Sequence, residues 1–170
     1  MSRRDDIINR ALYWSDPGSY RVAPDDLIYF FQTAGTEVAP TGAEAKEAMG
    51  YGGGVKVQGH AKQWCGIFAT CVLRECGLDA SWTLMGGKMR PSSDVKLVWG
   101  NQGMQPGDVA LIASASHHFI VVDVDYNKNT IHSVDGNQAW QTIKELTSRK
   151  VRYPRESQQL QPYGYYRIGG

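Results

Sequence analysis

The spacing of apolar residues changes along this chain of 170 residues, and that change limits the folds it can adopt. Before Gly100 apolar residues recur at helical spacing, whereas after Pro106 they form short runs typical of strands. Helices followed by a group of strands predict an α+β fold, with helices packed on an antiparallel sheet. The length suits one core better than two, so we expect a single domain over residues 1–170.

Local signals predict where the helices and strands lie. Ser2 is a candidate helix N-cap, and Asp16-Pro17-Gly18 ends that helix. Residues 50–54 are rich in glycine and predict a loop. Further helices are predicted over residues 25–31, 41–49 and 63–77, and over 95–99 after a cap at 92–94. Strands are predicted over residues 109–113, 118–124, 130–134, 151–153 and 164–168.

Composition excludes several classes of protein. The net charge of +1 gives no general attraction for a polyanion, so we expect no nucleic-acid partner. No apolar run reaches the roughly 18 residues of a membrane span, so we expect no membrane insertion. No apolar stretch follows the basic residues near the start, so we expect no signal peptide and synthesis in the cytoplasm.

The chain has three cysteines, Cys65, Cys71 and Cys76. They are too few and too close together for a disulfide framework, which indicates a reducing compartment.

Cys65 lies near the start of the predicted helix over residues 63–77. The free N–H groups and the dipole at a helix N-terminus favour a thiolate, which is the nucleophilic form of cysteine. The alternative for Cys65 is a small buried hydrophobic residue, and that reading is the better one for Cys71 and Cys76.

A cysteine nucleophile needs a base, and His118 begins an apolar strand. A turn centred on Asn127-Lys128 would pair His118 with Asn137 and Asp135 with Ile120. His118, Asp135 and Asn137 would then share one face, and a side-chain oxygen would orient the imidazole. A slip of one residue would bring His117 to that face instead. The alternative for residues 135–137 is a plain turn.

Four segments follow one another along the chain: Gln63-Trp64-Cys65, Pro106-Gly107-Asp108-Val109, His118-Phe119-Ile120-Val121-Val122 and Val134-Asp135-Gly136-Asn137. Together they resemble the CHAP family, the cysteine, histidine-dependent amidohydrolases and peptidases that cut peptidoglycan. The resemblance covers about residues 59–137, and residues 1–58 form a helical part that matches nothing in the family. It implies a papain-like fold, which the NlpC family shares.

The resemblance also implies roles for single residues. Cys65 would be the nucleophile, His118 the base, and Asp135 the orienting residue, where the family usually has Glu. Asn137 matches a further polar site residue, and the Gln63 side chain would join the Cys65 backbone N–H in an oxyanion hole. Trp64 stands beside the nucleophile, where it could line a substrate groove. The family commonly has Gly before its histidine, whereas this chain has His117.

The sequence predicts no metal or other cofactor. His60, His117, His132 and Asp135 could be imagined as zinc ligands, but no spacing such as HExxH occurs.

The expected activity is hydrolysis of an amide bond of peptidoglycan, by an amidase or an endopeptidase. We expect a monomeric antibacterial effector toxin that acts in the periplasm or cell wall, reaches it through a secretion system, and has a cognate immunity protein as partner. Three alternatives stay open: a phage endolysin released by a holin, a papain-like protease or deamidase toxin with a protein target, and a non-catalytic binding module.

Overall fold

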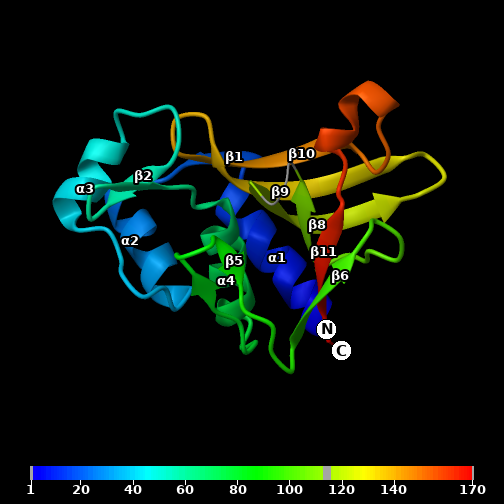
Figure 1. The fold of residues 1–170 in the computed structure, drawn as a ribbon, viewed down its shortest axis with the longest axis horizontal. Helices are drawn as coiled ribbons and strands as arrows, with labels where there is room; N and C mark the ends of the chain where they lie inside the picture. Colours follow the sequence, from blue (N-terminus) through cyan, green and yellow to red (C-terminus); the bar gives the residue numbers. More distant parts are fainter. Residues whose placement is uncertain (1, 113–115, 170) are drawn as a thin grey trace.

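The computed structural model describes residues 2–112 and 116–169 and has the α+β architecture expected from the sequence (Figure 1). Seven strands form one antiparallel sheet in the order β1-β10-β9-β8-β7-β11-β6. The helical part of the chain lies beside this sheet, and the two termini lie close together in the view of Figure 1. None of the described helices is long and apolar enough to cross a membrane.

The elements have the following bounds. The helices are α1 Arg3–Ser15, α2 Pro24–Thr33, α3 Gly42–Ala48, α4 Cys65–Glu75 and the 3-10 helix η1 Arg155–Leu160. The sheet strands are β1 Ser19–Arg21, β6 Val95–Trp99, β7 Val109–Ile112, β8 His117–Asp125, β9 Thr130–Gln138, β10 Thr142–Lys150 and β11 Gly164–Ile168. Two small hairpins pair β2 Val55–Val57 with β3 His60–Lys62, and β4 Trp82–Thr83 with β5 Lys88–Met89.

The starts of the first helices follow the local signals in the sequence. Ser2 caps α1 as predicted: its hydroxyl accepts from the Asp5 backbone N–H at 3.2 Å, and its own N–H donates to the Asp5 carboxylate at 2.8 Å. Thr41 and Glu44 form the same reciprocal pair at the start of α3. These contacts satisfy N–H groups that a helix start otherwise leaves without partners.

Two predicted elements are wrong. Residues 95–99 form strand β6 rather than a helix, because Val95–Trp99 pairs along its whole length with β11. The Ser92 hydroxyl accepts from the N–H groups of Asp94 and Val95, so the capping signal forms a turn before a strand. The predicted strand over residues 151–153 is also absent, and the strand in this region is β10, which ends at Lys150.

Helix α4 is the central element of the core and packs against α2, β8 and β9. Two glycines allow this close approach. A Cβ on Gly66 would lie 2.0 Å from the Trp82 ring, and one on Gly136 would lie 2.9 Å from Phe68. Because both neighbours are large buried rings, the start of α4 has little freedom to move relative to the sheet.

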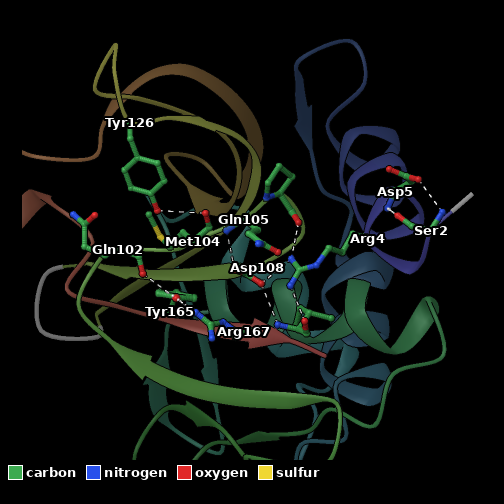
Figure 2. A network of polar contacts seen from close by, with 12 residues as sticks. Ser2, Arg4, Asp5, Gln102, Met104, Gln105, Asp108, Tyr126, Tyr165 and Arg167 are labelled. Atoms are coloured by element: carbon green, nitrogen blue, oxygen red, sulfur yellow. Dashed lines mark hydrogen bonds and ion pairs between the residues drawn. The ribbon is translucent and has the colours of Figure 1, made fainter. Parts of the chain in front are cut away.

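Arg4 ties α1 to the far end of the sheet (Figure 2). Its guanidinium donates to the backbone oxygens of Pro106 at 2.7 Å and Ile168 at 2.6 Å, and to the Asp108 carboxylate at 2.8 Å. Asp108 is fully buried and also accepts from the N–H groups of Gln105 and Ile168. The buried carboxylate thus holds together the start of β7, the end of β11 and the first helix.

We expect Arg4→Ala to lower the free energy of unfolding by about 3 kcal/mol or more, because it leaves the Asp108 carboxylate buried without its cationic partner. The adjacent Arg3→Ala is the matched control: its ion pair with Asp94 is largely exposed and should contribute under about 1 kcal/mol. Urea denaturation of both variants tests this difference. Equal midpoints for the two variants would show that the Arg4 contacts contribute no more than a surface pair.

Candidate active site

Cys65 is the first residue of α4, as the sequence predicted within two residues. The residue before it, Trp64, is the N-cap and gives no side-chain cap, because an indole has no acceptor for a backbone N–H; its own N–H donates to Gln141 Oε1 at 2.6 Å. The first N–H groups of α4 are therefore not occupied by the N-cap side chain, unlike those of α1 and α3. Cys65 is only 3% exposed, and its sulfur contacts the Ser116 backbone oxygen at 3.8 Å.

The placement of Trp64 corrects the expectation that it lines a substrate groove. The side chain is fully buried and stacks on Phe30 with ring centroids 5.8 Å apart. Its apolar surface belongs to the core, and its single polar atom bonds Gln141. Trp64 was predicted to line the groove because it precedes Cys65 in the sequence. The prediction was wrong because the chain passes at Trp64 from the β2–β3 hairpin into α4, and its side chain is buried there.

His117, at the start of β8, is the histidine that contacts Asp135. The distance from His117 Nε2 to Asp135 Oδ2 is 2.6 Å. Asp135 is fully buried and has two further partners, Arg149 at 2.5 Å and the Ser133 hydroxyl at 2.6 Å. Since Nε2 is occupied by Asp135, Nδ1 is the ring nitrogen of His117 that is available to the Cys65 thiol.

The predicted strand pairing is wrong by one residue on this side of the hairpin. Near the turn, Asp123 pairs with His132 as expected. A β-bulge between Val121 and Asp123 then shifts the register, so that Ile120 pairs with Val134 instead of Asp135. The shift places His117 rather than His118 beside Asp135, which is the one-residue slip left open by the sequence. Residues 135–137 lie within strand β9 and are not a turn.

His118, the next residue of β8, points to the opposite face of the strand from His117. It is 1% exposed, with its ring edge-on to Trp82 at 5.0 Å between centroids and stacked with Tyr166 at 6.2 Å. Together with Cys65 and Trp82 it lines a cavity of about 290 Å³. The ring is close enough to help lower the pKa of the thiol, yet neither nitrogen has hydrogen-bond geometry with any residue that the structure describes.

The charges of the site favour a thiolate and an imidazolium. Burial alone would raise the pKa of Cys65, but its interactions with the neighbouring His117 and His118 rings outweigh burial and lower the pKa to about 6. Burial would lower the pKa of His117, but its hydrogen bonds with Asp135 and Cys65 raise it to about 9. Between these two values the pair exists as thiolate and imidazolium, the reactive state of a cysteine nucleophile. Burial raises the pKa of Cys71 far above its usual value.

Asn137 and Gln63 form a second polar unit at the edge of the cavity. The Asn137 side chain accepts from the Gly54 backbone N–H at 2.6 Å and donates to the Gln63 side-chain oxygen. Gln63 lines the same cavity as Cys65. The predicted alignment of Asn137 with His118 is therefore wrong. Asn137 instead holds Gln63, the predicted oxyanion-hole residue, and the glycine loop near the thiol.

Three further residues of this site were not predicted from the sequence. Ser133 could have been found by strand alternation, because residues 133 and 135 share a face. Arg149 belongs to β10, a strand that no sequence pattern predicted, and its guanidinium also lies 4.2 Å from the centre of the Phe119 ring. Trp82 reaches the site from the short hairpin β4–β5, which carries no strand signal of its own.

No group of His, Cys, Asp or Glu in residues 2–112 and 116–169 is arranged to hold a metal ion. Comparisons of the chain with protein-family models, with curated proteins and with solved structures found no match.

The pH dependence of alkylation tests the charge arrangement. We expect iodoacetamide to modify Cys65 with an apparent pKa near 6. His117→Ala should move that pKa up by at least one unit, because the main cationic partner is lost. Asp135→Asn should move it in the same direction by less, since the neutral amide no longer stabilises the imidazolium.

Asn137→Ala is the matched control, because Asn137 contacts Gln63 and Gly54 rather than the ion pair. Its alkylation profile should stay within about 0.3 units of that of the unchanged protein, a small change on the scale of pKa shifts caused by charge loss. A larger shift in Asn137→Ala than in Asp135→Asn would make Asn137 the residue that supports the imidazolium.

Proposed function

We propose that this chain is a cysteine hydrolase that cuts an amide bond of bacterial peptidoglycan, and that it is a papain-like enzyme of CHAP type. The observation that carries the catalytic part is the buried thiol at the start of α4 beside a histidine held by a buried aspartate. The resemblance of the sequence motifs to the CHAP family carries the choice of substrate.

The proposed roles differ from the sequence expectation at one residue. His117, not His118, acts as the acid and base, because it has both the thiol and an orienting carboxylate as partners. Asp135 fixes the ring by accepting at Nε2, so that Nδ1 faces the thiol. Arg149 and Ser133 both donate hydrogen bonds to the Asp135 carboxylate and hold it in position.

Hydrolysis would proceed by acyl transfer. The Cys65 thiolate attacks the amide carbon, a C–S bond forms, and the carbonyl electrons move to oxygen. The C–N bond then breaks as the His117 imidazolium gives its proton to the leaving amine. Water attacks the thioester, His117 takes a proton from that water, and the acid leaves while the thiolate is restored. The Cys65 backbone N–H, at the start of α4, and the Gln63 side chain, in the cavity wall, would stabilise the oxyanion.

The surface around the thiol supports an extended substrate. The cavity beside Cys65 is adjacent to a second one of about 360 Å³, and the two share Lys62 and Leu84 in their walls. The β2–β3 hairpin forms one wall, and the loop of the β4–β5 hairpin, with Leu84 and Met85, forms the other. An elongated depression of this kind suits a peptide, such as the stem of peptidoglycan.

The direct test is digestion of purified sacculi, followed by mass spectrometry of the soluble products. Cys65→Ala should abolish release while the protein stays folded, because the thiolate is the nucleophile. Cys71→Ala is the matched control and should keep most of the activity, since that thiol is buried and its pKa is raised. A new muramic acid free of peptide would indicate an amidase, and split cross-links would indicate an endopeptidase.

Failure of the unchanged protein to release any product from sacculi would reject peptidoglycan as substrate. Cleavage or deamidation of proteins by the same preparation, dependent on Cys65, would then favour the alternative of a toxin with a protein target. Release by folded Cys65→Ala would remove the nucleophile assignment.

We also propose the antibacterial role and the periplasmic site of action on the basis of the same resemblance. Expression with an added export signal in a Gram-negative host should cause lysis, because the substrate lies outside the inner membrane. Expression without the signal, and export of Cys65→Ala, should leave growth unchanged. Equal toxicity with and without the signal would argue for a target in the cytoplasm.

A further inference from the structure

The buried imidazole of His118 has a polar edge that the described residues leave unsatisfied. Both ring nitrogens are buried, and neither bonds any residue that the structure describes. A buried donor or acceptor without a partner is unfavourable, and folded proteins contain few of them. His118 lines the cavity beside the Cys65 thiol, so a molecule in that cavity can supply the missing partner.

Aromatic packing fixes the ring in this position. Trp82 meets it edge-on at 5.0 Å, and Tyr166 is stacked with it at 20° between ring planes. Trp82 is itself fixed against Gly66, one residue after the nucleophile. The Tyr166 hydroxyl accepts from the Met89 backbone N–H, which holds that ring as well. His118 is therefore a rigid polar group beside the reacting sulfur, as a preorganised hydrogen-bond donor must be.

The role of base does not fit His118 well. A base that takes and returns a proton is normally oriented by an acceptor on its second nitrogen. Asp135 supplies that acceptor to His117, whereas no described residue supplies one to His118. A neutral imidazole carries one N–H donor, which suits it to bind an oxygen in the cavity.

We propose that His118 donates a hydrogen bond to the carbonyl oxygen of the bound substrate and stabilises the oxyanion that forms there, together with the Cys65 backbone N–H. The proposal rests on the proposed acyl transfer at Cys65 but not on the identity of the substrate. No bond to His118 forms or breaks: the thiolate adds to the carbonyl carbon, and the negative charge collects on the oxygen that His118 faces. The second ring nitrogen is left to accept from water or from an N–H of the substrate.

The test compares His118→Gln, which keeps a side-chain donor, with His118→Phe, which keeps the ring shape but has none. The probe is 4-nitrophenyl acetate, an activated ester whose reaction with Cys65 passes through an oxyanion and is followed by release of 4-nitrophenol. His118→Phe should slow acylation by about 10²–10³-fold, the usual loss for one oxyanion donor. His118→Gln should recover at least about tenfold of that loss, since its amide can donate to the same oxygen.

Alkylation by iodoacetamide is the second readout, because this reaction forms no oxyanion. Its limiting rate at high pH, where Cys65 is fully thiolate, should stay within about threefold in both His118 variants, a change far below the loss expected for an oxyanion donor. This result also shows that the site is still folded. His117→Gln is the matched control and should lower the extent of thiolate formation near neutral pH.

The outcomes separate this proposal from the proposed function. Acylation of His118→Phe at the rate of the unchanged protein would overturn it. Equal loss in His118→Gln and His118→Phe, with normal alkylation, would also overturn it, because the donor would then be irrelevant. If sacculi are not digested but the ester results are as expected, the role of His118 holds and peptidoglycan is the wrong substrate.

Discussion

The burial of one carboxylate, that of Asp135, determines how the candidate site is built. A fully buried charge is tolerated only when it is paired and hydrogen-bonded, and Asp135 obtains its partners from three neighbouring strands. His117 comes from β8, Ser133 from β9 itself, and Arg149 from β10. Any arrangement of these strands that separated the partners would leave Asp135 buried and unpaired. The carboxylate therefore constrains the sheet as well as the imidazole.

The same cluster balances its own charge. In the resting state the thiolate of Cys65, the imidazolium of His117, the carboxylate of Asp135 and the guanidinium of Arg149 alternate in sign and sum to zero. Arg149 also pairs with Asp135, and this second cation reduces the stabilisation that the carboxylate gives to the His117 imidazolium. Even so, the pKa of His117 is raised to about 9, so the carboxylate serves both cations.

The sequence could predict the features that contacts within a few residues stabilise, but not those that depend on pairing with distant segments. The Ser2 cap and the helices over residues 41–49 and 63–77 were predictable, because contacts within a few residues stabilise them. Residues 95–99 carried a local helix signal, yet pairing with β11, about 70 residues later in the chain, made them a strand.

The same distinction between local and long-range features applies to the residues of the candidate site. Cys65 and Asp135 could be identified from motifs, and the sequence placed a histidine at the start of β8. A bulge in β8, which no Gly or Pro indicates in the sequence, determines which of the two adjacent histidines contacts Asp135. The contact of Arg149 with Asp135 depends on strand β10, which no sequence pattern predicted. Both are consequences of long-range pairing, which a single sequence does not encode in any short segment.

The bulge in β8 sets the register that determines which of the two histidines faces Asp135. One additional residue between Val121 and Asp123 decides that His117 meets the carboxylate and His118 meets the aromatic rings. If Val122 were paired regularly instead, Ile120 would lie opposite Asp135 and the two histidines would exchange partners, while every side chain of the site stayed present in the chain. The partner of each histidine therefore depends on how the backbone accommodates one residue of β8, and not only on which side chains the site contains.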